Sequence, residues 1–168
     1  MIEIRAFYPD KHPDSHADAD ALWAMLEPVI RAGDVYALPL DMPREQALEY
    51  WLAAGNWVFV AEEDGLIVGS YYLRANQRGG GSHVANCGYL TSASAQGRGV
   101  AGAMCAHSLE FARSVGFRAM QFNFVVSTNE VAVHVWRKHG FAVVGRLPGA
   151  FHHPGFGYVD ALVMFREL

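Results

Sequence analysis

The sequence predicts one α/β domain built on a mixed β-sheet, and three features of the chain support this. Its 168 residues have the length of a single domain with a sizeable core, and no stretch has the composition of a linker. Segments that alternate apolar and polar residues take turns with segments whose apolar residues recur at helical spacing. Between 83 and 126 the order strand, helix, strand requires a parallel strand pair in an otherwise mostly antiparallel sheet.

The N-terminal half is expected to hold a strand, two helices and a hairpin. The second helix should begin near Pro43, because Asp41 can cap it and proline fits a first helical turn. The dipeptide at 64–65, Asp-Gly, predicts a tight turn between two strands. The expected elements are a strand at 2–7, helices at 19–30 and 43–54, and strands at 57–62 and 66–75.

The C-terminal half is expected to alternate strands with two helices. The spacing of Ser127 and Glu130 is that of a capping box, which predicts the start of the second of these helices, and Gly140 is expected to cap its end. Residues 147–157, rich in glycine, proline and aromatic residues, are expected to form a loop suited to a lid. The expected elements are strands at 83–91, 118–126, 141–146 and 158–165, and helices at 103–115 and 129–140.

Composition narrows the class of protein. The formal net charge of -4 argues against a surface that coats nucleic acid, since such surfaces gather Lys and Arg. Apolar residues make up 52% of the chain, which leaves area for a subunit interface, so a homodimer is one interpretation. Cys87 and Cys105 are expected to be buried thiols, and no signal sequence or membrane span is recognised. We therefore expect a cytosolic protein that binds neither nucleic acid nor membranes.

One run of residues predicts an anion site. Between the strand at 83–91 and the following helix, glycines allow a sharp turn and a close approach to a ligand. The first N–H groups of a helix have no intrahelical partner and lie at the positive end of its dipole, so a diphosphate would fit there. If this run is considered without the rest of the chain, the alternative is a glycine-rich turn that binds no ligand. The residues concerned are Gln96, Gly97, Arg98, Gly99, Val100, Ala101 and Gly102.

Two motifs in register give a family resemblance. Gln-x-x-Gly-x-Ala at 96–101, followed by Asn-x-x-Ala-x-x-x-Trp-x-x-x-Gly-Phe at 129–141, resembles the GCN5-related N-acetyltransferases, the GNAT superfamily. The resemblance covers nearly all of residues 1–168 and implies the GNAT fold, with a splayed pair of parallel strands flanked by helices. It implies acetyl-CoA as cosubstrate, no metal, and direct attack by an amine in a ternary complex.

The resemblance also implies roles for individual residues. Backbone groups of Tyr89, Leu90 and Thr91 would pair with the pantetheine arm, and the N–H of Leu90 would polarise the thioester carbonyl. The amide of Asn129 would bond the cosubstrate. Trp136 stands where many members have a tyrosine proposed to protonate the departing thiolate, which an indole cannot do. Trp136 is therefore interpreted as an apolar wall for the pantetheine, with core packing as the alternative.

The acceptor amine must lose a proton before it attacks, so side chains that could accept or relay one are of interest. Asn123 interrupts an apolar strand, where a buried amide needs a partner, and is expected to line the acceptor pocket, with Asp160 as a weaker companion. Tyr36 is expected to help the 147–157 segment close over the acceptor. The candidate bases or relays are His83, Asn86, Tyr36, His152 and His153.

Three functional interpretations follow. Within the superfamily the chain looks most similar to bacterial and fungal enzymes that acetylate small amino or imino acids, so a small-molecule amine is the expected partner. A protein N-terminus or lysine is the first alternative and predicts an open groove. An acyl-CoA-binding sensor without turnover is the second, and only Trp136 favours it. No residue is positioned by sequence to activate Cys87, so a covalent enzyme intermediate is not expected.

Overall fold

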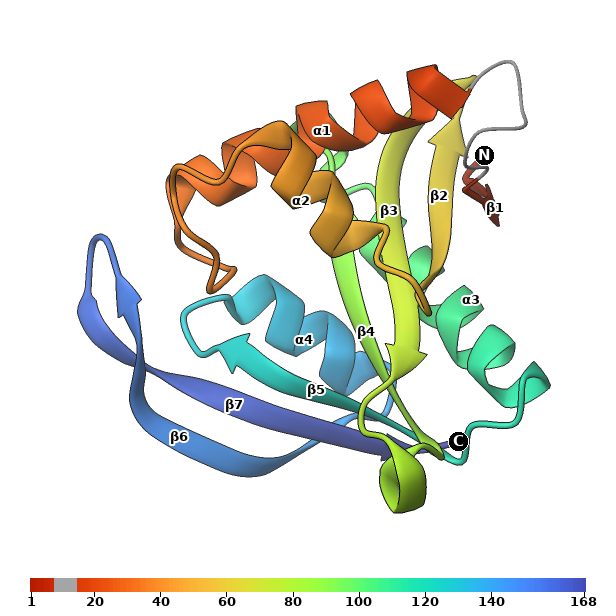
Figure 1. The fold of residues 1–168 in the computed structure, drawn as a ribbon. Coiled ribbons are helices and arrows are strands. Elements are labelled where there is room, and N and C mark those ends of the chain that lie inside the picture. The colour runs from red at the N-terminus through yellow and green to blue at the C-terminus, as the bar shows by residue number, and fades with distance from the viewer. Residues whose placement is uncertain (8–14) are drawn as a thin grey trace.

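The computed structural model describes residues 1–7 and 15–168 (Figure 1). Within these residues the chain forms one seven-stranded sheet and four α-helices in the order that the sequence predicts. None of the described helices is both long and apolar enough to cross a membrane. The elements are β1 (Glu3–Ala6), α1 (Ser15–Ala32), α2 (Arg44–Trp51), β2 (Trp57–Glu63), β3 (Leu66–Ala75), β4 (Val84–Thr91), α3 (Val100–Ser114), β5 (Ala119–Val126), α4 (Glu130–Lys138), β6 (Ala142–His153) and β7 (Gly157–Glu167).

The sheet has the strand order β1-β2-β3-β4-β5-β7-β6. All neighbouring pairs are antiparallel except β4 and β5, which are parallel, as the crossover through α3 requires. The prediction of a single parallel pair in a mostly antiparallel sheet is therefore confirmed. The result is a mixed α/β fold with one parallel strand pair, as the sequence predicts.

Helices cover both faces of the sheet. Leu22, Leu26 and Ile30 of α1 and Trp51 of α2 pack in one core cluster on the first face. The helices α3 and α4 pack on the opposite face, where Met104 and neighbouring apolar residues form the larger core cluster. Figure 1 shows α1 and α2 together on one side and α3 on the other. Each face therefore has its own core, and the sheet separates them.

The ends of two helices differ from the prediction. Pro43 is the N-cap of α2 and no side chain caps that helix, so Asp41 does not have its expected role. The helix ends at Trp51, three residues before the expected end, because Leu52, its C-cap, leaves the helical conformation with φ of -95° and ψ of 17°. At α4 the predicted capping box does not form.

The start of α4 is fixed by Asn129 instead of Ser127. The Asn129 Oδ1 accepts a hydrogen bond from the backbone N–H of Ala132 at 3.2 Å, which satisfies one free donor of the first turn. The predicted box would have used the N–H of Glu130, whereas Asn129 accepts from that of Ala132, so the helix is capped two residues later than expected.

The predicted lid loop is wrong. Residues 147–153 continue β6, and residues 154–156 form the turn to β7, so the segment is a long hairpin. Pro148 and Gly149 do not end the strand, because the register shifts between Leu147 and Phe151 and takes them up in a bulge. In Figure 1 the hairpin of β6 and β7 projects from the body of the molecule.

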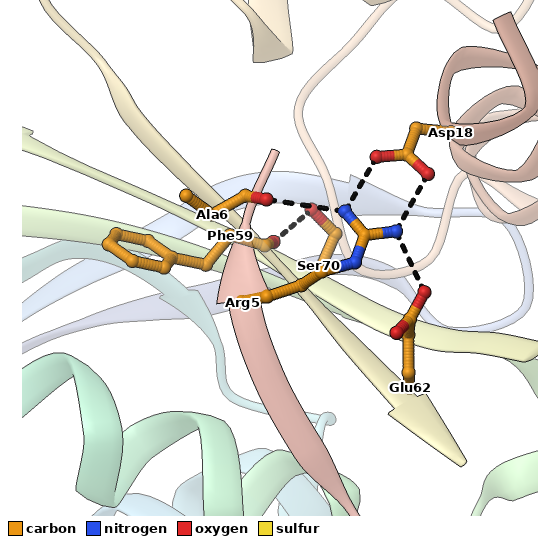
Figure 2. Close-up of polar contacts among 6 residues, drawn as sticks. All are labelled: Arg5, Ala6, Asp18, Phe59, Glu62 and Ser70. Atoms are coloured by element: carbon orange, nitrogen blue, oxygen red, sulfur yellow. Dashed lines mark hydrogen bonds and ion pairs between the residues drawn. The ribbon is translucent and has the colours of Figure 1, made fainter. Parts of the chain in front are cut away.

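A partly buried ion pair fastens α1 to the edge of the sheet. Arg5 of β1 donates to both oxygens of Asp18 at 2.8 and 2.9 Å and to Glu62 of β2 at 2.7 Å. Figure 2 shows this fork, with the Ser70 hydroxyl donating to the carbonyl of Phe59 beside it. A paired, hydrogen-bonded arginine of this kind satisfies a carboxylate that would otherwise be costly to bury.

Candidate active site

A cleft of about 950 Å³ opens where β4 and β5 part. The two strands pair only at Val84 with Ala119 and at Ala85 with Met120. Beyond this point β5 contains a bulge between Phe122 and Val125 and bends away. The cleft is lined by the last turns of α1, by α2, by β3, β4 and β5, by the start of α3, by α4, and by the loops that follow α1 and β4.

The hydrogen bonds between β3 and β4 show which backbone groups face the cleft. The N–H of Asn76 donates to the carbonyl of Val84 at 2.8 Å, and the N–H of Ser92 donates to that of Val68 at 2.9 Å. In an antiparallel ladder the bonded pairs recur at every second residue, and the register between these two bonds is continuous. The even-numbered residues of β4 therefore bond to β3, and the odd-numbered residues face the gap.

This alternation corrects one expectation. Leu90 lies opposite Ser70 in a bonded pair, so its N–H is directed to β3 and is not free to polarise a thioester carbonyl. The backbone groups directed into the gap belong to Cys87, Tyr89 and Thr91. Two of the three strand residues expected at the pantetheine, Tyr89 and Thr91, thus remain suitable.

One of these groups already has a partner within the chain. The hydroxyl of Tyr36, in the loop between α1 and α2, donates to the backbone carbonyl of Tyr89. The ring of Tyr36 packs edge-on against Trp51, with 6.3 Å between ring centroids. Burial raises the pKa of Tyr36, so the hydroxyl keeps its proton and acts as a donor. The loop therefore borders the cleft, as expected for Tyr36.

The predicted anion turn also borders the cleft. Gly97 and Gly99 have φ of 75° and 83°, a left-handed conformation that favours glycine, and Gly99 caps α3. The first intrahelical bond joins the N–H of Ala103 to Gly99, which leaves the N–H groups of the preceding turn available. Arg98 is the exception among the predicted residues, because it forms an ion pair with Glu63 outside the cleft. Those that line the cleft are Gln96, Gly97, Gly99, Val100, Ala101 and Gly102.

Asn129 and Trp136 bring α4 to the same cleft. The Asn129 oxygen is taken by the helix cap, while its amide nitrogen has no partner among the described residues. The buried Trp136 ring lies 4.6 Å from the Tyr89 ring and 5.1 Å from the Phe122 ring, measured between centroids. Trp136 therefore both lines the cleft and packs in the core, so the two interpretations of this residue are compatible.

On the α1 and α2 side, the cleft has a polar floor formed by Tyr72, Arg74, Asn86 and Asn123. Register pairs put Tyr72 opposite Gly88 and Arg74 opposite Asn86. A Cβ at Gly88 would lie 2.5 Å from Tyr72 Cε1, so glycine is required for the Tyr72 ring to lie across β4. The half-buried Arg74 places its guanidinium 5.2 Å from the centroid of that ring.

Asn123 lies at the cleft as expected but is exposed, not buried. The bulge in β5 turns this part of the strand toward solvent. Its Nδ2 donates to Asn76 Oδ1 at 2.7 Å, and its Oδ1 accepts from Gln121 Nε2 at 2.9 Å. The amide of Asn86 donates to the Gln121 carbonyl at 3.0 Å, so the floor is connected by amide contacts.

Sequence reasoning missed Arg74. The signal was present in the hairpin, since the alternation along β3 puts Tyr72 and Arg74 on one face. Which face of β3 borders the cleft depends on where β4 diverges from β5. The sequence of the β2–β3 hairpin carries no information about that divergence.

His83 is not at the cleft. It precedes β4 and lines a separate hollow together with Arg118 and Glu167. Parallel strands that start together and diverge later put their first residues at the closed end, so a residue before β4 is remote from the gap. His83, one of the candidate bases or relays, therefore lies away from the cleft and is not proposed for that role.

The hairpin residues are not at the cleft either. Asp160 accepts from the N–H of Gly149 at 2.9 Å and forms an ion pair with Arg146 at 2.9 Å, which makes it a structural residue of the β6–β7 bulge. His152 stacks on Tyr158 near the hairpin turn, and His153 lies on the same turn. None of these side chains lines the cleft, so Asp160, His152 and His153 lose their proposed roles.

The charges in the cleft are few. Among the described residues that line it, Arg74 is the one charged side chain, and there is no Asp, Glu or His. Burial raises the pKa of the Cys87 thiol and of the Tyr89 hydroxyl, so both stay protonated. No three His, Cys, Asp or Glu side chains within residues 1–7 and 15–168 are arranged to hold a metal ion. The geometry suits backbone and amide recognition of a ligand.

Comparison with known proteins supports the family resemblance that the two sequence motifs indicate. Residues 20–141 match the sequence model of the Acetyltransferase (GNAT) family. The chain is 26% identical over 151 residues to the N-acetyltransferase aca1 of Schizosaccharomyces pombe, covering 80% of this chain and 72% of that protein.

Solved structures agree in fold. A GCN5-related N-acetyltransferase from Kribbella flavida is 38% identical, with a TM-score of 0.91 over 99% of this chain and 98% of that chain. A phosphinothricin acetyltransferase from Sinorhizobium meliloti, solved in complex with AcCoA, superposes with a TM-score of 0.84. It is 19% identical over 99% of this chain and 88% of that chain, so it supports the fold alone.

Proposed function

Since the chain belongs to the GNAT acetyltransferase family and is an acetyl-CoA-dependent N-acetyltransferase, we propose that its acceptor is a small amine that carries an acidic group. The observation that carries the proposal is Arg74, a half-buried cation in the cleft with no carboxylate partner among the described residues. A guanidinium forms two parallel hydrogen bonds to a carboxylate or phosphinate, which makes it a selective receptor for such a group.

The residues around the cleft fit the cosubstrate. The gap-facing N–H of Tyr89 and backbone groups of Thr91 can pair with the amide-containing arm and its thioester, and the 96–102 turn offers free N–H groups to a diphosphate. Bound acetyl-CoA supplies the acetyl group as a reactive thioester. On this assignment the reactive end would lie toward Tyr89 and the nucleotide end toward α3, which is the order of strand and turn along the chain.

We assign the carbonyl-polarising role to the N–H of Tyr89 in place of Leu90. A fixed backbone donor stabilises the oxygen on which negative charge develops, an effect worth on the order of 10²–10³ in rate where one such donor has been removed. The free amide nitrogen of Asn129 is a second donor at the same cleft. Both groups are held by secondary structure, so they need no rearrangement during the reaction.

Transfer then proceeds by direct attack of the amine. Cys87 lines the cleft, but burial raises the pKa of its thiol, and no histidine among the described lining residues could activate it. Arg74 and Asn123 would orient the acceptor, and the Tyr36 loop would limit its size. Holding both reactants at reacting distance supplies most of the acceleration.

The test is a thiol-release screen with acetyl-CoA over amino acids, polyamines, aminoglycosides and short peptides. Acidic small amines should be acetylated, and Arg74→Gln should raise the acceptor KM at least tenfold while leaving that of acetyl-CoA within about twofold. Asn123→Ala should shift the acceptor KM in the same direction. Arg74→Lys, which keeps the charge, should recover part of the loss. Equal activity on polyamines and acidic amines would contradict the proposal.

Two alternatives have specific tests. Because residues 147–157 form a projecting hairpin and not a lid, a protein N-terminus or lysine stays a second candidate acceptor, and the peptide arm of the screen addresses it. A non-catalytic acyl-CoA sensor is supported by Trp136 alone. Tight acetyl-CoA binding without thiol release from any acceptor would favour the sensor.

The assembly and compartment are also proposals. Val144, Phe156 and Tyr158 of the β6–β7 hairpin are 61%, 72% and 78% exposed, which supports a homodimer through this hairpin. Light scattering of the protein and of Phe156→Ser tests it.

The compartment and the domain count are proposals too. Two free, buried cysteines fit a reducing compartment such as the cytosol. We treat residues 1–168 as one domain.

A further inference from the structure

The acceptor must reach the thioester with a lone pair on nitrogen, and the cleft offers unusual conditions for this. A protonated amine has none, so a proton must leave before attack. The described lining residues with titratable or charged side chains come from the α1–α2 loop, α2, β3 and β4, while β5 and α4 contribute none. They are Tyr36, Tyr50, Tyr72, Arg74, Cys87 and Tyr89.

None of these groups is suited to take the proton. Burial raises the pKa of Tyr36, Tyr72, Cys87 and Tyr89, so each is already protonated at neutral pH. The Tyr36 hydroxyl is in addition committed as a donor to the Tyr89 carbonyl, and the Tyr50 and Tyr72 hydroxyls contact each other at 3.3 Å.

The same cleft disfavours a second cation. Arg74 carries the one formal charge among its described lining residues, and its guanidinium lies over the Tyr72 face, where an ammonium could otherwise bind. Like charges in a partly desolvated cleft repel each other more strongly than in water. An acidic group on the acceptor would offset the repulsion by pairing with Arg74. The amine itself would still have no carboxylate partner among the described residues that line the cleft.

We propose that this cleft binds its acceptor amine as the uncharged free base, and that its substrate class is a weakly basic amine carrying a carboxylate or similar acid, such as an aryl amine acid. This deepens, and rests on, the proposed function. The aromatic side chains of Tyr36, Tyr50, Tyr72, Phe122 and Phe124, which also line the cleft, suit a flat apolar body between the amine and the acid.

The reaction balances without a further reactant. The amine nitrogen forms a bond to the acetyl carbon, and the carbon–sulfur bond breaks with its electron pair on sulfur. The surplus proton of the nitrogen passes to that sulfur or to solvent, giving the amide and the free thiol. A weakly basic nitrogen needs no earlier deprotonation by the protein, which is why the absence of a base among the described lining residues is tolerable.

The test compares two probes that share a benzoate and differ in the charge of the amine. At neutral pH 4-aminobenzoate has an uncharged amine, and 4-(aminomethyl)benzoate has a cationic one. For the first, kcat/KM should be independent of pH between 6 and 9. For the second, kcat/KM should rise about tenfold for each pH unit across the same range, because only the free base reacts. Aniline and benzylamine, which lack the acid, should both be poor acceptors.

A matched pair of variants changes the charge of the polar floor. Asn123→Asp replaces an amide that lines the cleft by a carboxylate of the same shape, and Asn123→Ala removes the amide without adding charge. Relative to Asn123→Ala, Asn123→Asp should raise kcat/KM for 4-(aminomethyl)benzoate at pH 7 at least tenfold and should not raise it for 4-aminobenzoate.

The outcomes are separable. A plateau of kcat/KM below pH 8 for 4-(aminomethyl)benzoate would reveal a base in the protein and overturn this inference, while leaving acetyl transfer to acidic amines intact. Preference of the screened panel for strongly basic amines at neutral pH would overturn it as well. Release of no thiol with any acceptor, despite acetyl-CoA binding, would instead overturn the proposed function.

Discussion

The Tyr36 hydroxyl is hydrogen bonded to the backbone carbonyl of Tyr89, a group that faces the gap between β4 and β5. One residue of a helix-connecting loop is thereby tied to the strand along which the pantetheine arm is proposed to lie. The loop and the strand belong to different parts of the chain, 53 residues apart. This contact couples the loop beside the proposed acceptor site to the strand beside the proposed cosubstrate site.

Tyr36→Phe removes this bond and leaves the ring packing on Trp51 in place. We expect the free energy of unfolding to fall by about 1 kcal/mol and the acceptor KM to rise several-fold, because the loop is no longer held at the cleft. Acetyl-CoA affinity, measured by calorimetry, should stay equal or increase, since a gap-facing carbonyl becomes free. Tyr158→Phe, at an exposed site on the hairpin, is the control and should change none of these three quantities.

Gly99→Glu places a carboxylate at the turn proposed to hold the diphosphate. The left-handed φ of 83° costs any other residue about 1 kcal/mol, and the charge adds repulsion to an anionic ligand. Acetyl-CoA affinity should fall at least a hundredfold by calorimetry. Gly99→Ala carries the same backbone strain without charge and should lose far less. Unchanged affinity of the Glu variant would remove the diphosphate assignment.

Gly88→Ala should disturb the polar floor. The added Cβ would lie 2.5 Å from Tyr72 Cε1, so the Tyr72 ring must move and Arg74 above it must follow. We expect a loss of stability of about 1–3 kcal/mol and a rise in the acceptor KM that exceeds any rise for acetyl-CoA. Gly80→Ala adds the same methyl group where nothing lies within 4 Å and serves as the control.

Asp18→Asn tests the anchor of α1. The Asp18 side chain is 5% exposed and holds Arg5 through two hydrogen bonds, so the variant should lower the free energy of unfolding by about 1–3 kcal/mol in urea titrations. Asp20→Asn breaks the ion pair with Arg44 at a side chain that is 72% exposed. That variant should stay within about 0.5 kcal/mol of the parent. Equal effects of the two would contradict the anchoring role.

Stability should fall in alkali because of the buried thiols. Burial raises the pKa of Cys105 to about 12 and raises that of Cys87 further, whereas both ionise near 8.5 in the unfolded chain. As the pH rises above about 9, only the unfolded state loses these protons, so each thiol lowers the free energy of unfolding by up to about 1.4 kcal/mol per pH unit. Urea midpoints from pH 8 to 10 measure the slope. Cys105→Ala should make it shallower, and a flat profile in the parent would refute the burial argument.

Much of the fold was predictable from the sequence because its signals are local. Apolar periodicity and glycine turns gave the element order, and the crossover through α3 required the parallel pair. The glycine turn before α3 and the position of Asn129 at the start of the next helix were predictable for the same reason, since each depends on residues close together in the chain. The bulge at Pro148 and Gly149 was not predictable, because a strand tolerates these residues only when its partner strand shifts register.

The roles of Leu90, His83 and Asp160 show where local reasoning fails. Which backbone groups of β4 face the gap depends on which residues bond to β3, and a change of one residue in that register would reverse the answer. His83 and Asp160 have suitable chemistry but lie at the closed end of the strand pair and on the hairpin. Distance to the cleft is a property of the assembled sheet.

By itself, the sequence determined the family, the order of elements and the glycine turn, since those follow from residue spacing along the chain. Only the tertiary structure decided that Arg74 is the charge in the cleft and that Tyr89, not Leu90, presents its backbone there. The physical reason is that strand pairing and strand divergence bring together residues far apart in the chain, and their geometry depends on the partner strand as well as on the residues themselves.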